Sequence, residues 1–384
     1  MFKILFLILS LLSLLSAKIT LASSQTELYL PLLKGKRVAL VVNQSSVVKN
    51  IHLVDLLLQK KVQIKKIFAP EHGFRGGVDA GYSVKNSIDK RTSLPIISLY
   101  GKKKKPTKKD LNNIDIIIFD IQDVGVRFYT YLSTLHYILE VGAKYNIPII
   151  VLDRPNPNAH YIDGEVLNRK YSSFIGLDPV PIVYGMTIGE YAKMVNGEGW
   201  LGRGLKAKLK VIPMSNYTHK TIYTLPIKPS PNLSNSRAIL LYPSLALFEG
   251  TLFSAGRGTD SPFEIYGHPK YKNKSFSFIP KSTKGARYPK FKNVKCYGVN
   301  LSGKSLKRIR AEGKINLSYI IDAYHKYPVK KDFFLKNRFI DRLSGSSRLR
   351  QQIIKGYSEA QIRDSWRVGL NKFRKIREKY LIYK

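Results

Sequence analysis

The sequence predicts an α/β protein: a mostly parallel sheet covered on both faces, followed by a smaller α+β domain. Three observations support this. Val/Ile-rich runs alternate with helical patterns in the first half of the chain, and polar residues follow each run. After about residue 245 the composition changes to mixed aromatic and lysine content. A chain of 384 residues accommodates two domains, which we place at 23–245 and 246–384.

The first domain is expected to contain five strands in its opening part. Their runs lie at 37–43, 62–70, 94–101, 114–125 and 147–157. Helical patterns lie between them at 51–60 and 129–146. Because these runs are continuously apolar instead of alternating, the strands are expected to be buried on both faces of a parallel sheet.

The rest of the chain is more mixed. A helix is expected over 187–200 and a strand over 209–214, followed by a proline-rich passage. Residues 270–299 have β character, and the last 75 residues look helical. Ser358 and Gln361 have the spacing of a capping box, which predicts the start of the final helix.

The N-terminus reads as a secretory signal peptide over 1–22. One lysine precedes an apolar run from Ile4 to Leu15, and small residues follow, so cleavage after Ala17 or Ala22 is expected. The run is short for a membrane span, so the mature form is expected to have none. We therefore expect a secreted or periplasmic protein of a bacterial envelope. The sole cysteine, Cys296, excludes an intrachain disulfide and a cysteine-rich metal site.

The charge is strongly positive, at +39 from 65 basic and 26 acidic residues. Such a field attracts nucleic acid, anionic membrane or an acidic polymer. The alternative is a lysine-rich composition scattered over every exposed face. Because the chain is expected to be exported, we expect cell-wall polymer as the partner and no specific nucleic acid.

Polar residues follow each predicted strand, which is where an open α/β sheet binds its ligands. Because parallel strands end at the same edge, these groups are expected to share one rim. In strand order they are Asn43; Glu71, His72 and Arg75; Tyr100; Asp120, Gln122 and Asp123; and Asp153, Arg154 and Asn156. The turn "APEHGFRG" is the most unusual of them, since it places a carboxylate, an imidazole and a guanidinium together among glycines.

Several of these residues also have a purely structural interpretation. Asp120 and Asp153 are suited to cap the turn after a strand, and Asn43 to close a loop. Arg127 either pairs with Asp123 as scaffold or binds a ligand carboxylate through its two parallel donors.

Carboxylates dominate the chemistry that the sequence offers. Downstream, Asn232, Glu249 and Arg257 lie in passages that look like a substrate loop closing over the rim. The chain has neither a GxSxG serine nor an HExxH metal motif, so we expect no metal and no cofactor. Paired carboxylates are sufficient for glycoside hydrolysis, and basic and aromatic neighbours suit an anionic sugar.

Long motifs support a family resemblance over essentially the whole mature chain. The runs "APEHGFRG", "FDIQDVGVRFYTY", "LDRPNP", "GMTIGEYAKMVN", "EGTLFSAGRGTDSPFE" and "IDRLSGSSRLRQQI" resemble the NamZ family of exo-β-N-acetylmuramidases. The resemblance implies a Rossmann-like N-terminal domain, a smaller C-terminal domain, a site between them and no cofactor. It implies an exported enzyme that removes N-acetylmuramic acid from non-reducing ends of peptidoglycan fragments. Tyr82, Leu252 and Ala255 depart from the family pattern, which bears on substrate contacts.

The resulting hypothesis gives Glu71 the role of general acid, with His72 orienting it. Asp120 or Asp123 would stabilise positive charge or position water, and Arg127, Arg154 or Arg257 would hold the lactyl carboxylate. The other expected substrate contacts are Asn43, Arg75, Tyr129, Asp153, Asn156, Asn232 and Glu249. Retaining, inverting and substrate-assisted routes all stay open. The alternative function is a peptidoglycan-binding protein without catalysis.

Overall fold

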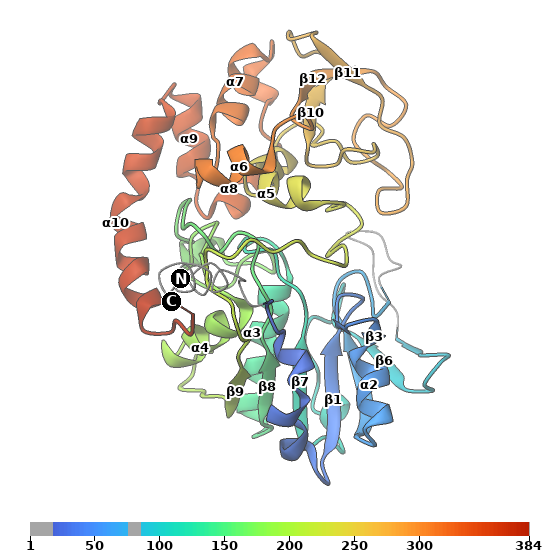
Figure 1. Cartoon of the computed structure of the whole chain (residues 1–384). Coiled ribbons are helices and arrows are strands. Elements are labelled where there is room, and N and C mark those ends of the chain that lie inside the picture. Colours follow the sequence, from blue (N-terminus) through green and yellow to red (C-terminus); the bar gives the residue numbers. More distant parts are fainter. Residues whose placement is uncertain (1–17, 76–85, 384) are drawn as a thin grey trace, which may run out of the picture.

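The computed structural model of the chain describes residues 18–75 and 86–383 (Figure 1). Most of the expected signal peptide and Tyr82 lie outside these ranges. Within the described ranges, no helix combines the length and apolarity needed to cross a membrane.

The first domain is built on a seven-stranded sheet with the order β5-β6-β4-β1-β7-β8-β9. Every neighbouring pair is parallel except β5 with β6. Counted along the chain, the six parallel strands follow the order 3-2-1-4-5-6 that is typical of Rossmann-like sheets. The strands are β1 (Arg37–Val42), β4 (Gln63–Ala69), β5 (Ser87–Ile88), β6 (Pro95–Ser98), β7 (Ile116–Asp120), β8 (Ile149–Leu152) and β9 (Leu209–Ile212).

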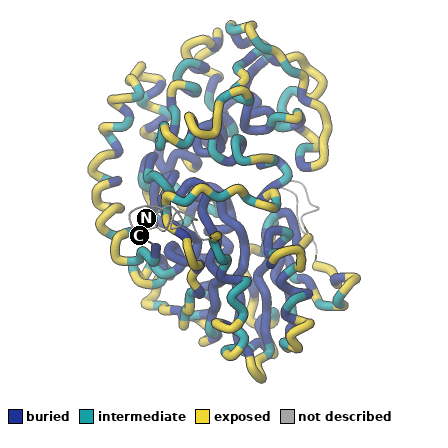
Figure 2. The backbone as a smooth tube through the Cα atoms, in the orientation of Figure 1, coloured by how far each residue is buried: buried dark blue, intermediate teal, exposed yellow. Residues whose placement is uncertain are grey.

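Both faces of the sheet are buried, as the continuous apolar runs predict. In β1, Val38 and Leu40 belong to one hydrophobic cluster, together with Leu57 of α2 (Leu53–Gln59). Ala39 and Val41 belong to another, which includes residues of α3 (Tyr131–Lys144) and α4 (Ile188–Gly197). Figure 2 shows the buried strands at the centre, with exposed residues on the outer turns and loops.

The second domain combines a small antiparallel sheet with helices. Its strands pair in the order β10-β12-β11. The strands are β10 (Ile265–His268), β11 (Phe276–Phe278) and β12 (Cys296–Asn300), and the helices are α5 (Ser236–Leu245), α6 (Leu306–Glu312), α7 (Ser318–Lys326), α8 (Phe339–Ser344), α9 (Arg348–Ile354) and α10 (Glu359–Glu378). This arrangement confirms the predicted fold class.

Two details of the helices bear on the sequence predictions. The capping box at the start of α10 is present, because Ser358 and Gln361 exchange hydrogen bonds with each other's backbone. The proline-rich passage, by contrast, contains the helix α5, with Pro243 in its interior. Its start is capped by Asn235, which accepts a hydrogen bond from the Ala238 amide.

The end of the chain returns to the first domain. α10 runs down the side of the molecule in Figure 1 toward α4. Beyond it, Tyr383 packs with Met214 and Tyr217 and with residues near Ile19. The C-terminal helices are therefore tied to the sheet domain at their far end. The predicted boundary at residue 245 stays a prediction.

Candidate functional site

The turn after β4 places Glu71 at the carboxyl edge of the sheet. Its backbone is tight, because His72 and Gly73 both have positive φ and the Gly73 amide bonds the Pro70 carbonyl at 3.0 Å. His72 is buried at 3% exposure, whereas Glu71 is partly exposed. Thr130, just before α3, donates a hydrogen bond to Glu71 Oε2 at 2.7 Å. The turn thus buries the imidazole and presents a carboxylate in a fixed orientation.

Several phenols and one guanidinium surround the Glu71 carboxylate. Burial raises the pKa of Tyr100, and the charge of Glu71 with its hydrogen bond raises that pKa further. Burial is also the main cause of the raised pKa values of Tyr131 and Tyr242, with Glu71 contributing to both. Glu71 further favours the charged form of Arg257. These effects identify Glu71 as the electrostatic centre of the site.

The second domain contributes an exposed ion pair to the same region. Arg257 Nε lies 2.6 Å from Glu249 Oε1, and each side chain is 26% exposed. Burial acts against the charge of Arg257, but Glu249 outweighs it, so the pKa of Arg257 is raised. The guanidinium also lies 4.9 Å from the ring centre of Phe263. A planar cation held in this way is suited to bind a carboxylate.

Lys290 organises the segment that carries this pair. Its Nζ donates to the carbonyls of Thr251 at 2.6 Å and Phe253 at 3.1 Å. The carbonyls of Phe248 and Glu249, in the short helix η7 (Ala246–Gly250), lie 3.4 Å away. Burial lowers the pKa of Lys290 to about 8. Nothing in the sequence distinguishes three further residues of the site. Lys290 resembles the many other lysines, Thr130 an ordinary residue at a helix start, and Tyr242 an ordinary core aromatic.

Asp120 and Arg154 form a buried ion pair with each other. Arg154 Nη2 donates to Asp120 Oδ2 at 2.8 Å, and its Nε donates to Oδ1 at 2.5 Å. Both side chains are buried. The pair lies at the edge between β7 and β8, and the expected catalytic role of Asp120 and substrate contact of Arg154 stay predictions.

Asp153 and Asn156 are bonded to other parts of the protein. Asp153 accepts hydrogen bonds from the Gly189 amide, the Thr187 hydroxyl and the Tyr383 hydroxyl. Burial raises the pKa of Asp153 to about 6. Asn156 is 3% exposed and donates to the Met186 carbonyl at 2.7 Å. The expectation that these two residues contact substrate stays a prediction.

Arg127, another of the expected carboxylate binders, is bonded to backbone carbonyls inside the protein. It is 1% exposed and donates to the carbonyls of Glu165, Val180 and Leu343, each at 2.8 Å. It therefore joins the sheet domain to α8 and does not pair with Asp123. Arg75 lies at the surface but forms a two-pronged pair with Asp89, at 2.9 and 3.1 Å.

The remaining expected residues form a layer beneath Glu71. Asp123 is 2% exposed and accepts from the Tyr184 hydroxyl and the Gly125 amide through one oxygen, while its Oδ1 has no partner. Tyr129 donates to the Pro229 carbonyl at 2.7 Å. Asn43 accepts hydrogen bonds from the amide and hydroxyl of Ser45, and the Asn232 side chain donates to the Gly285 carbonyl. All the strand ends do share one edge, but Glu71 is the carboxylate among them that faces outward.

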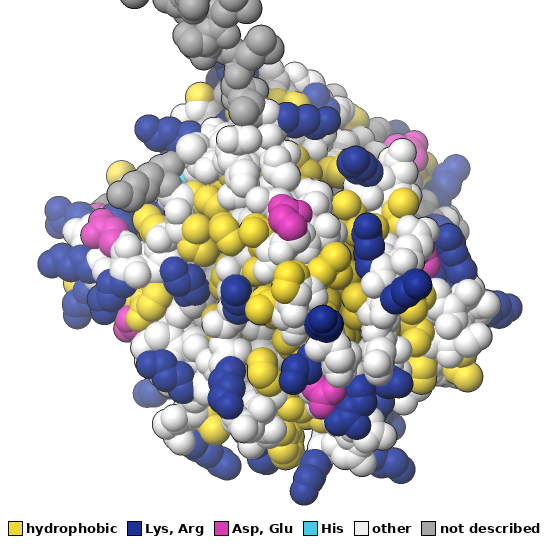
Figure 3. Space-filling view, turned by 60° about the horizontal axis from the view of Figure 1, so that its bottom comes forward, with side chains coloured by type: hydrophobic (Ala, Val, Ile, Leu, Met, Phe, Trp, Pro, Cys, Tyr) yellow, Lys and Arg dark blue, Asp and Glu magenta, His cyan; other side chains and the backbone are white. Residues whose placement is uncertain are grey.

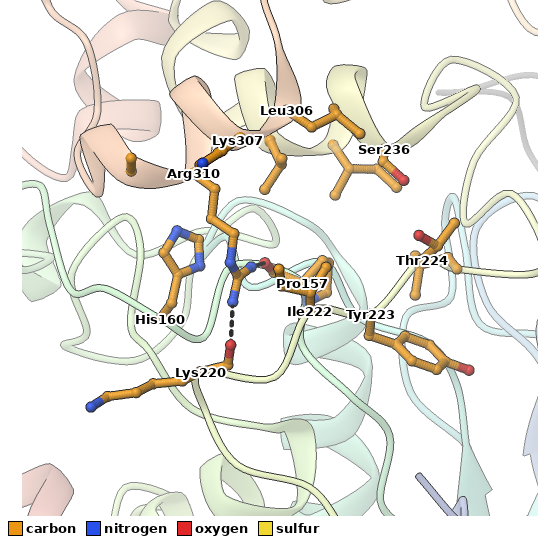
Figure 4. A pocket seen from close by; sticks show the side chains of 14 residues that line it. Pro157, His160, Lys220, Ile222, Tyr223, Thr224, Ser236, Leu306, Lys307 and Arg310 are labelled. Atoms are coloured by element: carbon orange, nitrogen blue, oxygen red, sulfur yellow. Dashed lines mark hydrogen bonds between the residues drawn. The ribbon is translucent and has the colours of Figure 1, made fainter. Parts of the chain in front are cut away.

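A separate cavity of about 580 Å³ lies between residues 220–225, α5 and α6 (Figure 4). Arg310 crosses it and donates to the Lys220 carbonyl at 2.8 Å. Its lining contains no Asp or Glu, and burial lowers the pKa of its histidine, His160, to about 4. The cavity therefore offers no carboxylic acid, and its histidine is neutral near neutral pH, so we do not place glycoside hydrolysis there.

The positive charge is spread over the surface. Lys and Arg side chains are scattered over the face seen in Figure 3, separated by hydrophobic and uncharged surface and by few acidic residues. No single stripe of the kind that follows a nucleic-acid backbone stands out on this face.

Comparisons with known proteins agree over nearly the full length. Residues 38–237 match the family described as "Exo-beta-N-acetylmuramidase NamZ, N-terminal", and residues 240–383 match its C-terminal counterpart. The chain is 40% identical to the peptidoglycan beta-N-acetylmuramidase NamZ of Bacillus subtilis (strain 168) over 370 residues, which cover 91% of this chain and 88% of that protein.

Two crystal structures of DUF1343 family proteins from Bacteroides fragilis NCTC 9343 are also similar. One has a TM-score of 0.89 at 45% identity and covers 96% of this chain and 99% of its own. The other has a TM-score of 0.79 at 29% identity, with coverage of 95% and 99%. With both domains matched in sequence and in fold, this chain belongs to the NamZ exo-β-N-acetylmuramidase family of glycosidases.

Proposed function

We propose that this glycosidase removes N-acetylmuramic acid from the non-reducing end of peptidoglycan fragments outside the cytoplasm, in cell-wall turnover. The observation that carries the proposal is the outward-facing Glu71 carboxylate, held by Thr130 and close to Tyr100 and Arg257. The name of the Bacillus subtilis relative supports the same substrate class.

In the proposed reaction, protonated Glu71 donates its proton to the glycosidic oxygen. The bond between that oxygen and the anomeric carbon then breaks, and the leaving saccharide departs with a new hydroxyl group. An oxygen nucleophile forms the new bond to the anomeric carbon, either water directly or first the acetamido group of the sugar. Water finally supplies the new hydroxyl, and its proton returns to the Glu71 carboxylate.

Arg257 is the proposed partner of the lactyl carboxylate, which distinguishes muramic acid from N-acetylglucosamine. Arg154 and Arg127 are buried, whereas Arg257 is 26% exposed on its side chain although it pairs with Glu249, so Arg257 supports this role better. Arg257 keeps its ion pair with Glu249 in either case, but the neutral analogue brings no carboxylate and so lacks the second charge-assisted interaction that the lactyl group provides. Strong discrimination between the two sugars is therefore expected.

The test uses two substrates with different leaving groups. Glu71→Gln retains an oxygen that can accept from Thr130 but cannot donate a carboxylic proton. We expect kcat on a muramic acid–glucosamine disaccharide to fall by about 100-fold or more. The loss should be smaller on a 4-nitrophenyl muramic acid glycoside, because nitrophenolate leaves without a proton. Glu378→Gln, an exposed residue on α10, is the matched control and should keep wild-type rates.

Three outcomes separate the possible functions. No release of nitrophenol by the wild type, with binding of peptidoglycan retained, would favour a non-catalytic binding protein. Equal release from the glucosamine glycoside would contradict recognition of the lactyl group. Unchanged rates in Glu71→Gln would remove Glu71 as the acid while leaving the activity intact.

A further inference from the structure

A row of aromatic rings and lysines leads away from Glu71 across the sheet domain. Tyr100, next to Glu71, has its ring centre 6.0 Å from that of Phe174. The Phe174 and Tyr137 rings are stacked, with centres 6.2 Å apart and planes 12° from parallel. All three rings are partly exposed. We call these rings, together with Lys104 and Lys105, the aromatic–lysine row.

The two lysines are held over the rings. Lys104 Nζ lies 4.8 Å from the ring centre of Phe174, and Lys105 Nζ lies 5.3 Å from that of Tyr137. Contact with an aromatic face restricts a side chain that is otherwise highly flexible. Both lysines are exposed, so the row presents two ammonium groups to solvent in defined positions.

Acidic neighbours neutralise this charge only in part. Lys105 Nζ pairs with Glu140 Oε1 at 2.8 Å, and Glu140 is 23% exposed on its side chain. No carboxylate of the described residues pairs with Lys104. The row is therefore a positively charged surface with apolar ring faces beneath it.

The row begins at Tyr100, beside Glu71, which bears on the part of the substrate that it could contact. The proton of Glu71 goes to the oxygen that joins the cleaved sugar to the leaving portion, so the leaving portion begins beside Glu71 and Tyr100. Arg257 is already assigned to the carboxylate of the cleaved sugar. We propose that the aromatic–lysine row binds the leaving portion, and that it favours saccharides whose leaving portion carries carboxylates, either lactyl or peptide. This inference rests on the proposed function.

The experiment compares four substrates that share the cleaved muramic acid. They are the 4-nitrophenyl glycoside, the disaccharide with a neutral glucosamine leaving group, the trisaccharide with a second muramic acid, and that trisaccharide bearing a stem peptide. Lys104→Gln/Lys105→Gln removes both charges of the row. We expect KM for the two anionic trisaccharides to rise about three- to tenfold at low salt, and less at high salt. KM and kcat for the nitrophenyl glycoside and the neutral disaccharide should stay within about twofold.

Two further variants sharpen the test. Lys108→Gln/Lys109→Gln removes two exposed charges from the same loop, away from the rings, and should leave all four substrates unaffected. Glu140→Gln removes the competing carboxylate and should lower KM for the anionic substrates. An effect on the trisaccharide without peptide identifies the lactyl carboxylate as the ligand; an effect confined to the peptide-bearing substrate identifies the peptide.

The outcomes distinguish this inference from the proposed function. If the wild type cleaves all four substrates and the row variant changes none of them, the inference is overturned and the activity stands. Equal losses on all four substrates, or in the control variant, would overturn it as well, since they indicate a general structural or charge effect. If the wild type cleaves none, the proposed function fails and this inference fails with it.

Discussion

At the scale of single residues, the site depends on which carboxylates are buried and what they bind. Glu71 reaches the surface because its turn buries His72 instead. Asp123, behind it, is buried with one oxygen bonded twice and the other without a partner. Burial raises the pKa of Asp123 to about 6, since the ionised form loses its hydration. The contribution of Asp123 to the free energy of unfolding therefore depends on pH.

The pH dependence has a definite sign. In the folded protein Asp123 keeps its proton up to about pH 6, whereas the unfolded chain releases it near pH 4. Folding therefore binds a proton between these values, and stability falls as pH rises from about 4 to 6. Asp123→Asn removes this titration. Over that pH range the free energy of unfolding of the variant should therefore decrease by about 2–3 kcal/mol less than that of the wild type. Urea unfolding at pH 4 and pH 7 measures the difference, and parallel curves for the two proteins would contradict it.

At the scale of elements, the segment from η7 to Arg257 is held by Lys290 in addition to its backbone hydrogen bonds, such as that from the Leu252 amide to the Phe333 carbonyl. The ammonium group lies among four carbonyls that point the same way at the end of a short helix. Such oxygens carry partial negative charge, so a cation is suited to satisfy them. Because this segment carries Glu249 and Arg257, Lys290 acts on the site as a positioning residue.

Replacing Lys290 should disturb binding more than a surface lysine would. Lys290→Met leaves several buried carbonyls without a donor, which costs about 2 kcal/mol of stability. The freed segment should raise KM for the muramic acid glycoside more than it lowers kcat, because Arg257 loses its orientation. Lys292→Met, an exposed neighbour, is the control for charge and size. A loss of stability with unchanged KM would show that Lys290 supports the fold alone.

The sheet and its edge could be predicted from the sequence, whereas the partners of the buried polar residues could not. Val/Ile runs and strand ends predicted the parallel sheet and placed Glu71 on its edge, because both depend on local patterns. The sequence could not tell that Asp120 faces Arg154, since that pair depends on how two strand ends 34 residues apart approach each other. Likewise, the sequence could not predict that Arg127 donates to three carbonyls, because these belong to segments far away along the chain. Burial of polar residues is a property of tertiary packing, and one sequence does not reveal it.

At the scale of the whole molecule, the two domains are joined by buried polar contacts. Arg127 ties the sheet domain to α8 through the Leu343 carbonyl. The C-terminal tail makes a second connection, because Tyr383 donates to buried Asp153 and its amide bonds Glu190 Oε1. Glu190 also accepts from His219 at 2.8 Å. The second domain is therefore joined to the first by two sets of buried polar contacts, one at Arg127 and α8 and one at the C-terminal tail.

Removing the tail should weaken this connection. Truncation after Lys379 takes away the donors that Tyr383 and Ile382 provide to Asp153 and Glu190. Two buried carboxylates then lose part of their hydrogen bonds, although Asp153 keeps the Thr187 and Gly189 donors and Glu190 keeps His219. The loss of three donors should cost about 3 kcal/mol and lower Tm. Tyr383→Phe isolates the hydroxyl and should cost about 1–2 kcal/mol, whereas Tyr357→Phe, an exposed tyrosine, should cost almost nothing. If the truncated chain keeps its Tm but loses activity, the tail positions the domains without stabilising them; if it keeps both, the tail contacts do not hold the two domains together.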